Sequence, residues 1–392
     1  MGGDCPQTCC KGWLIPLDED DLVRYSNEKG RLGLSLFTAT AGFTRNRINL
    51  FSGECRYHTR EGLCRLQLEK GHDFIPWACR SFPRFYRNYG ELEERYLDLS
   101  CIAAADIFVR NAGNLRIVED EGEPETRPCT TNDDKEYLET LINIRRDIIE
   151  TITGLLPPES DPKDMVSGSS GPGGRNTEEL LIQFGKTTDL LYSYACSLQD
   201  MYAKGSIDTL IPRFSEYQSR EDKGKIQCFP FSMDLFRRLT ESLLYYFGQK
   251  KTGPELHVLL KDAQSFIVRY RKNEGAFTEM VDRLFNCTPS LFTLLAGYMS
   301  YYLYQYFPEA YETYSFRKLT AIGIIHTNMI LFLLLVSTDR KYRSGTDTGG
   351  CGTDRIIEEA EIAYIIAIYN RKAYFNETVQ NDLYRIFEQQ RD

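Results

Sequence analysis

Residues 4–13 read DCPQTCCKGW, and the sulfur-rich pattern continues in residues 53–55 (GEC), 62–65 (GLCR), 77–84 (WACRSFPR) and 100–101 (SC). Seven of the twelve cysteines fall in these stretches, within the first hundred or so of 392 residues. Thiols at this density, beside arginine and tryptophan, are typical of a soft-metal or iron–sulfur site. The candidate metal ligands are Cys5, Cys9, Cys10, Cys55, Cys64, Cys79 and Cys101.

The cysteines are interpreted as ligands rather than as disulfide partners. A disulfide framework suits short secreted chains that cannot bury a sufficient core, and this chain has 392 residues. Residues 1–5 (MGGDC) have neither the basic nor the apolar segment of a signal peptide. We therefore expect a cytoplasmic, reducing setting in which the thiols remain available to a metal.

The spacing of the cysteines favours an iron–sulfur cluster over zinc. Cys9 and Cys10 are adjacent, so they are poorly placed to bind one tetrahedral ion together. Cys55 and Cys64 flank an eight-residue loop, and Cys79 follows fifteen residues later. Zinc ribbons use paired C-x2-C knuckles, whereas the irons of a cubane cluster accept irregularly spaced thiolates. We expect a 4Fe–4S cluster; a structural zinc ion, or buried cysteines without a metal, are the alternatives.

Basic and aromatic residues beside the cysteines are candidate cofactor contacts. A cluster bound by four thiolates is a net anion, and Arg65, Arg80 and Arg84 are placed to offset that charge. Trp13 and Trp77 are the two tryptophans of the chain, and each lies within three residues of a candidate ligand. They either shield the metal from water or hold a cation, such as a sulfonium, against an indole face.

The composition is that of a soluble globular chain with an acidic balance. Apolar residues make up 42%, charged residues 26%, and the net charge is −9. This charge argues against a broad nucleic-acid surface. The sequence contains no Gly-rich phosphate loop, no G-x-G-x-x-G after a strand, no H-E-x-x-H and no G-x-S-x-G. An ordinary Rossmann-type methyltransferase or dehydrogenase is therefore disfavoured.

Hydrophobic periodicity predicts a mainly α protein in which a Cys-rich, loop-rich unit packs on an α-helical C-terminal region. The predicted parts are the Cys-rich unit (1–113), an acidic loop and connecting helix (114–160), a flexible linker (161–176) and an α-helical domain (177–392). Within the first part we expect a helix over 17–29, short strands or extended loops over 31–54 and a helix over 92–112. Further helices are expected over 136–156, 177–203, 231–250, 254–273, 275–286, 288–307, 311–337, 354–370 and 375–390.

Residues 319–337 form an apolar run close to membrane-spanning length. Thr320, His326 and Asn328 lie within it, and such polar groups are costly in hydrocarbon. We expect a buried core helix without stable membrane insertion; a membrane-tethered helix is the alternative. The tyrosine-rich stripe over residues 301–306 is likewise expected to be core rather than the lining of a cofactor site.

The combined pattern D-C-P-Q-T-C-C-K-G-W, C-x8-C, C-R-S-F-P-R and L-x-L-S-C, over roughly residues 4–105, resembles the flagellin lysine N-methylase family. More broadly, it resembles small zinc- or iron-chelating cysteine-cluster proteins. The first resemblance implies methyl transfer from S-adenosylmethionine to lysine side chains of flagellin. It also implies an iron–sulfur cluster held by four of the seven cysteines, without indicating which four. A non-catalytic zinc- or iron-binding interaction or assembly protein is the alternative, and it predicts no binding of S-adenosylmethionine.

Overall fold

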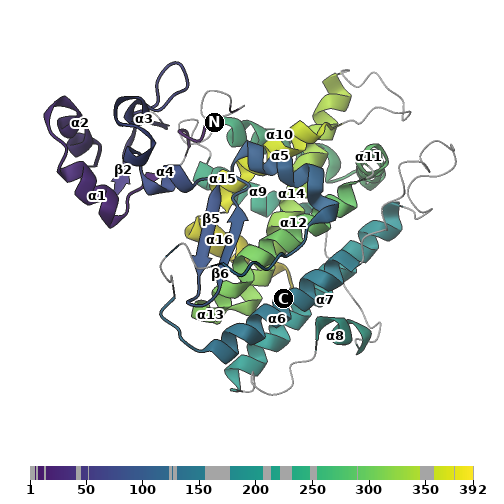
Figure 1. Ribbon diagram of the computed structural model, residues 1–392. Helices are drawn as coiled ribbons and strands as arrows, with labels where there is room; N and C mark the ends of the chain where they lie inside the picture. Colours follow the sequence, from purple (N-terminus) through teal and green to yellow (C-terminus); the bar gives the residue numbers. More distant parts are fainter. Residues whose placement is uncertain are drawn as a thin grey trace, which may run out of the picture.

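The computed structural model describes residues 5, 8–12, 15–40, 46–51, 53–122, 126, 130–154, 177–205, 213–220, 232–247, 254–288, 290–344, 357–374 and 376–391. Helices dominate these residues and the strands are short, so the predicted mainly α fold is confirmed. In Figure 1 the first three helices lie to one side of a larger helical body. The predicted boundaries at residues 113, 160 and 176 stay predictions, and the expected linker over 161–176 lies outside the described residues.

The N-terminal unit consists of short elements around a small core of its own. These are β1 (Ile15–Pro16), α1 (Glu19–Ser26), α2 (Gly30–Thr40), β2 (Arg47–Ile48), β3 (Leu50–Phe51), β4 (Glu54–Cys55), α3 (Arg65–Lys70), the 3-10 turn η1 (His72–Phe74) and α4 (Trp77–Ser81). The predicted helix over 17–29 is confirmed as α1. The expectation of extended structure is wrong for residues 31–40. The buried face of α2 carries Leu32, Leu36 and Ala39 at helical spacing. This periodicity outweighs the strand propensity of the threonines nearby.

A hairpin then connects this unit to the helical body. Strand β5 (Arg84–Asn88) pairs antiparallel with β6 (Glu93–Leu97), and α5 (Ile102–Asn111) and the 3-10 turn η2 (Ala112–Asn114) follow. The predicted helix over 92–112 is therefore wrong for its first part. Glu94 and Tyr96 alternate as buried residues with exposed Arg95 between them, a two-residue period that the sequence analysis did not separate from the helical one. The Tyr301 hydroxyl donates to the Leu97 carbonyl oxygen at 2.7 Å and so fixes the hairpin against the body.

The helical body follows the predicted order closely. Its helices are α6 (Lys135–Gly154), α7 (Thr177–Ala203), α8 (Phe214–Arg220), α9 (Met233–Phe247), α10 (Pro254–Tyr270), α11 (Glu274–Cys287), α12 (Leu291–Tyr306), the 3-10 turn η5 (Phe307–Glu309), α13 (Ala310–Thr313), α14 (Phe316–Ser344), α15 (Glu359–Ala373) and α16 (Glu377–Arg391). α14 runs through the middle, where it contacts α7, α10, α12, α15 and α16. α5 packs on α15, so the chain segment after the hairpin joins this larger core.

The apolar run is the buried part of α14. By length and composition this helix is able to cross a membrane, yet every residue of its most apolar window is buried by the surrounding helices. His326 lies within it, with Nδ1 2.8 Å from the Tyr369 hydroxyl oxygen on α15. The predicted buried core helix is thus confirmed, and the Thr327 hydroxyl in it donates to the Gly323 carbonyl oxygen of the same helix at 2.9 Å.

Candidate functional site

Backbone pairing brings several of the candidate cysteines into one neighbourhood. The Cys55 backbone N–H donates to the Cys10 carbonyl oxygen at 2.8 Å, which places the first cysteine segment beside β4. The His58 N–H donates to the Cys55 carbonyl oxygen at 2.9 Å, and His58 forms an antiparallel bridge with Cys64. Cys79 lies in α4 and packs against the same small core. Four cysteines far apart in sequence therefore share one core.

The electrostatics of these thiols reflect that proximity. Burial, together with negative charge on Cys10 and Cys64, raises the pKa of the Cys55 thiol to about 12. Burial and then the charges of Cys55, Cys10 and Cys64 raise the pKa of Cys79 well above its ordinary value. None of Cys10, Cys55, Cys64 and Cys79 forms a disulfide. A positive ion among them would relieve this mutual repulsion.

Cys9 and Cys10 have different environments although they are adjacent. A hydrogen bond from Cys9 is the main cause that lowers the pKa of Cys10 to about 6, and the same bond raises the pKa of Cys9. Cys5 is exposed. Cys101 is half-buried at the start of α5, where its charge acts on Arg371, as does that of Cys9, and it does not pack in the core that holds Cys10, Cys55, Cys64 and Cys79.

Within the described part of the chain, no three His, Cys, Asp or Glu side chains form a ready-made metal site. Cys10, Cys55, Cys64 and Cys79 thus share a neighbourhood without meeting at one point. The four-thiolate cluster stays a prediction.

Of the candidate cofactor contacts, Trp77, Arg80 and Arg84 differ in how far they are exposed to solvent. Trp77 begins α4 and is 43% exposed, and its ring centroid lies 6.5 Å from that of Tyr86. Arg80 is half-buried, and Arg84 is exposed as the first residue of β5. Trp13 lies outside the described residues. The proposed roles of all four in cofactor binding stay predictions.

The end of α15 connects the N-terminal unit with the interior of the helical body. Arg371 donates to the Ser100 carbonyl oxygen at 2.7 Å, and the Lys372 ammonium donates to the Gly12 carbonyl oxygen. Burial lowers the pKa of Lys372. Two residues further on, Tyr374 lines a cavity inside the body. The cysteine segments and this cavity are therefore joined by one short stretch of chain.

The cavity, which we call the aromatic cavity, has a volume of about 710 Å³ and is bounded by the hairpin and by α12, α13, α14 and α16. Its aromatic lining includes Phe85, Tyr86, Tyr96, Tyr302, Tyr306 and Tyr374. Tyr302 and Tyr306 stack with centroids 4.9 Å apart, and Tyr374 meets both rings edge-on at 5.4 and 4.9 Å. In the stripe expected to be core, Tyr302 and Tyr306 are buried as predicted, whereas Tyr301 and Tyr304 are half-buried. The two buried tyrosines also line this cavity.

Charged groups of both signs also line the aromatic cavity. The Arg87 guanidinium pairs with Glu309 at 2.6 Å, donates to the Tyr96 hydroxyl at 3.1 Å and lies 5.0 Å from the Tyr306 ring centroid. Lys318 and Glu377 contribute a further charge of each sign. Sequence periodicity does not reveal this site, because its wall combines a hairpin with helices more than two hundred residues later in the chain.

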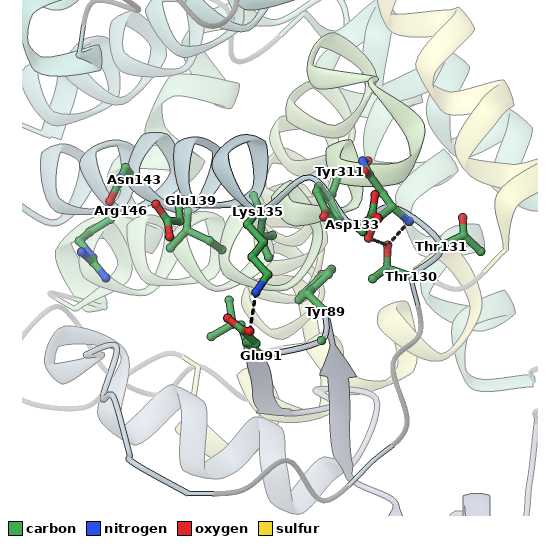
Figure 2. A pocket seen from close by; sticks show the side chains of 15 residues that line it. Tyr89, Glu91, Thr130, Thr131, Asp133, Lys135, Glu139, Asn143, Arg146 and Tyr311 are labelled. Carbon is green, nitrogen blue, oxygen red and sulfur yellow. Dashed lines mark hydrogen bonds and ion pairs between the residues drawn. The ribbon is translucent and has the colours of Figure 1, made fainter.

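A second cavity of about 730 Å³ lies next to the first, since Tyr89 and Thr130 line both. Figure 2 shows Lys135 reaching from the start of α6 to Glu91 in the hairpin turn, and this ion pair is largely exposed to solvent. The remaining lining combines polar side chains with Leu92, Leu138 and Ile142, and it lacks the ring cluster of the aromatic cavity. The aromatic cavity is therefore the stronger candidate for a small-molecule site.

Comparison with known proteins gives partial matches. The chain is 29% identical over 115 residues to a lysine-N-methylase of Salmonella choleraesuis (strain SC-B67), covering 26% of this chain and 27% of that protein. It is 30% identical over 108 residues to the flagellar biosynthetic protein FliU of Salmonella muenchen, covering 26% of this chain and 64% of FliU. A lysine-N-methylase of Salmonella typhimurium (strain LT2) matches at 28% over 115 residues, again 27% of its length. No family model and no solved structure matches the chain. It thus has a distant, partial relationship to proteins named lysine-N-methylase, and it spans about a quarter of their length.

Proposed function

We propose that this chain is a protein lysine N-methyltransferase that uses S-adenosylmethionine and acts on lysine side chains of flagellin. The names of the partly matching relatives support methyl transfer to lysine and a flagellar substrate. The structural observation that carries the proposal is the large aromatic cavity, which two stretches of chain join to the core that holds four cysteines. One is β5, which starts three residues after α4, and the other is the end of α15.

An iron–sulfur cluster fits the donor set of that core. Cys10, Cys55, Cys64 and Cys79 are the thiols that would hold it, because they share one core, in which the charges of neighbouring thiols add to burial in raising the pKa of Cys55, Cys64 and Cys79. A bound cluster supplies a redox-active anionic centre that ties the short loops together. The half-buried cations of the neighbourhood, Arg371 and Lys372 among them, are suited to balance its charge.

Methyl transfer from S-adenosylmethionine to lysine requires a deprotonated amine. The lysine nitrogen must lose a proton before it forms the new N–C bond, while the S–C bond of the sulfonium breaks and S-adenosylhomocysteine departs. A buried aromatic setting disfavours the protonated amine and so supports this proton loss. Tyrosine faces also attract the sulfonium cation, as they attract other organic cations.

Methyl transfer from labelled S-adenosylmethionine to flagellin tests the proposal. The anaerobically purified full chain is incubated with both substrates, and lysine-containing peptides are analysed by mass spectrometry. We expect methylated lysines with the unaltered chain and with Cys5→Ser, whose thiol is exposed. We expect a loss of about tenfold or more with Cys79→Ser, whose thiol lies in the shared core.

Metal-loaded protein that methylates no lysine of flagellin would refute the proposed activity. That result would favour a non-catalytic metal-binding protein. Equal activity of Cys5→Ser and Cys79→Ser would leave the proposed activity standing, but it would show that this activity does not depend on the cysteine core.

A further inference from the structure

The aromatic cavity has the size and the lining of a site for a zwitterionic small molecule with an aromatic part. We propose that it is the binding site for S-adenosylmethionine, an inference that rests on the proposed methyltransferase function. It assigns a place to a cosubstrate that neither the sequence pattern nor the relatives locate.

The volume of the cavity fits S-adenosylmethionine better than it fits a lysine side chain. The cavity measures about 710 Å³, within the range of roughly 300–1,000 Å³ that holds molecules of drug-like size. A lysine side chain contributes about five non-hydrogen atoms, so it would leave most of this space to water. A nucleoside joined to an amino acid matches the volume much better.

The aromatic lining provides contacts for both the adenine ring and the sulfonium. Phe85 stacks on Tyr96 with centroids 5.6 Å apart, and these rings face the cavity from the hairpin. Tyr302, Tyr306 and Tyr374 form the cluster on the helical side. Aromatic rings bind a flat base by stacking and a sulfonium by cation–π attraction.

An unsatisfied polar atom in the lining also points to a ligand. Tyr306 is 6% exposed, and its hydroxyl has no hydrogen-bond partner among the described residues. A buried hydroxyl without a partner is costly, so native proteins satisfy nearly all such groups. Tyr306 belongs to the cavity lining, although its hydroxyl oxygen has almost no accessible surface, so a ligand with ring nitrogens or hydroxyl groups would meet it only after a small shift of the ring.

The charges match the amino-acid half of the cosubstrate. Its carboxylate needs a cation and its ammonium needs a carboxylate, and the cavity offers Lys318 and Glu377, whereas Glu312 already accepts hydrogen bonds from Thr131. Neither forms an ion pair with another residue in the described ranges. Arg87 and Glu309, by contrast, already pair with each other. We therefore assign Lys318 to the carboxylate and Glu377 to the ammonium.

Calorimetric titration of the full chain with S-adenosylhomocysteine and with sinefungin tests the assignment without any turnover. Glu377→Gln has a matched control in Glu274→Gln. Both glutamates are the first residue of a helix and follow an asparagine whose side chain accepts a backbone hydrogen bond at 3.2 Å. We expect Glu377→Gln to raise Kd about fivefold and Glu274→Gln to leave it unchanged.

Lys318→Gln provides the second arm, with the exposed Lys272→Gln as its control. We expect Lys318→Gln to raise Kd about tenfold, because half-buried charged hydrogen bonds contribute more than exposed ones. Equal Kd values for the cavity variants and their controls would overturn the inference. A methyllysine peptide whose affinity responds to Glu377→Gln, while that of S-adenosylhomocysteine does not, would overturn it in favour of a lysine site.

The two proposals fail in different ways. Binding of S-adenosylhomocysteine that the cavity variants weaken, in a chain that methylates no lysine, supports the cavity assignment and refutes the proposed function. Lysine methylation by the unaltered chain, with binding that the cavity variants leave unchanged, refutes the cavity assignment alone.

Discussion

The buried ion pair between Glu94 and Arg145 gives the sharpest prediction about what fixes the cavity wall. Glu94 lies in β6 and Arg145 in α6, and their side chains are 5% and 3% exposed. Arg145 donates to one Glu94 oxygen at 2.8 Å and pairs with the other, and it also donates to the Tyr304 carbonyl oxygen at 2.8 Å. The pair therefore connects the hairpin to two helices of the body.

The burial of this ion pair determines how much unfolding free energy its loss should cost. Glu94→Gln keeps the shape of the side chain but leaves the Arg145 guanidinium without a negative partner in a dry setting. Breaking a buried pair in this way costs about 3–5 kcal/mol of unfolding free energy. The control is Glu241→Gln, because Glu241 pairs with Arg237 on the surface of α9, with side chains 51% and 37% exposed. Such a pair contributes about 0.5 kcal/mol or less.

Urea unfolding followed by far-UV circular dichroism measures both variants. This signal reports the helical body, whereas fluorescence reports the N-terminal unit, because both tryptophans precede residue 78. Replacing both partners, as in Glu94→Leu with Arg145→Met, should cost less than Glu94→Gln alone. A cost below about 1 kcal/mol for Glu94→Gln, similar to that of the surface control, would refute the role assigned to this pair.

Three further predictions concern the helical body, at a buried glycine, an exposed glycine and a buried histidine. In Gly323→Ala the new Cβ would lie 2.6 Å from Tyr302 Cδ1, and we expect a net loss of about 1 kcal/mol after the gain in helix propensity; a stabilised protein in urea unfolding would contradict this. In Gly154→Ala the new Cβ meets nothing within 4 Å, so the same assay should show a gain of about 0.5 kcal/mol, and a loss would be inconsistent with an open position. Burial lowers the pKa of His326 from 6.5 to about 3, so the unfolded chain binds more protons in this interval and stability falls as the pH drops below 6.5. From pH 7 to pH 5 the loss should be about 2 kcal/mol, and His326→Gln should remove it, since Gln can still bond to Tyr369 without titrating; an unchanged pH profile would argue against a neutral buried imidazole.

Prediction of secondary structure from the sequence was most accurate where the local hydrophobic periodicity agrees with burial in the folded protein. The helix predicted over residues 177–203 has the same bounds in the structure, and α14 is buried as its polar interruptions indicated. It failed over residues 93–97, where a short strand is followed after four residues by a helix. There a window long enough to reveal a helix averages over both elements.

The candidate sites likewise include features that the sequence predicts and features that it does not. The pattern of cysteines singled out the residues that share the N-terminal core, but it did not show that Cys101 lies apart, at the start of α5. The aromatic cavity escaped prediction for a different reason. Tyr302 and Tyr306 are one helical turn apart and have the spacing of ordinary core residues. Only the packing of the hairpin against α12 and α16 makes them the lining of a cavity.

Metal analysis of the anaerobically purified chain, combined with its absorption spectrum, tests the central claim most directly. We predict a brown protein with about four iron atoms per chain. The iron should be lost in single Cys→Ser variants at Cys10, Cys55, Cys64 and Cys79 and retained in Cys5→Ser. A colourless protein, one with stoichiometric zinc instead of iron, or iron that survives all four core substitutions would contradict the account.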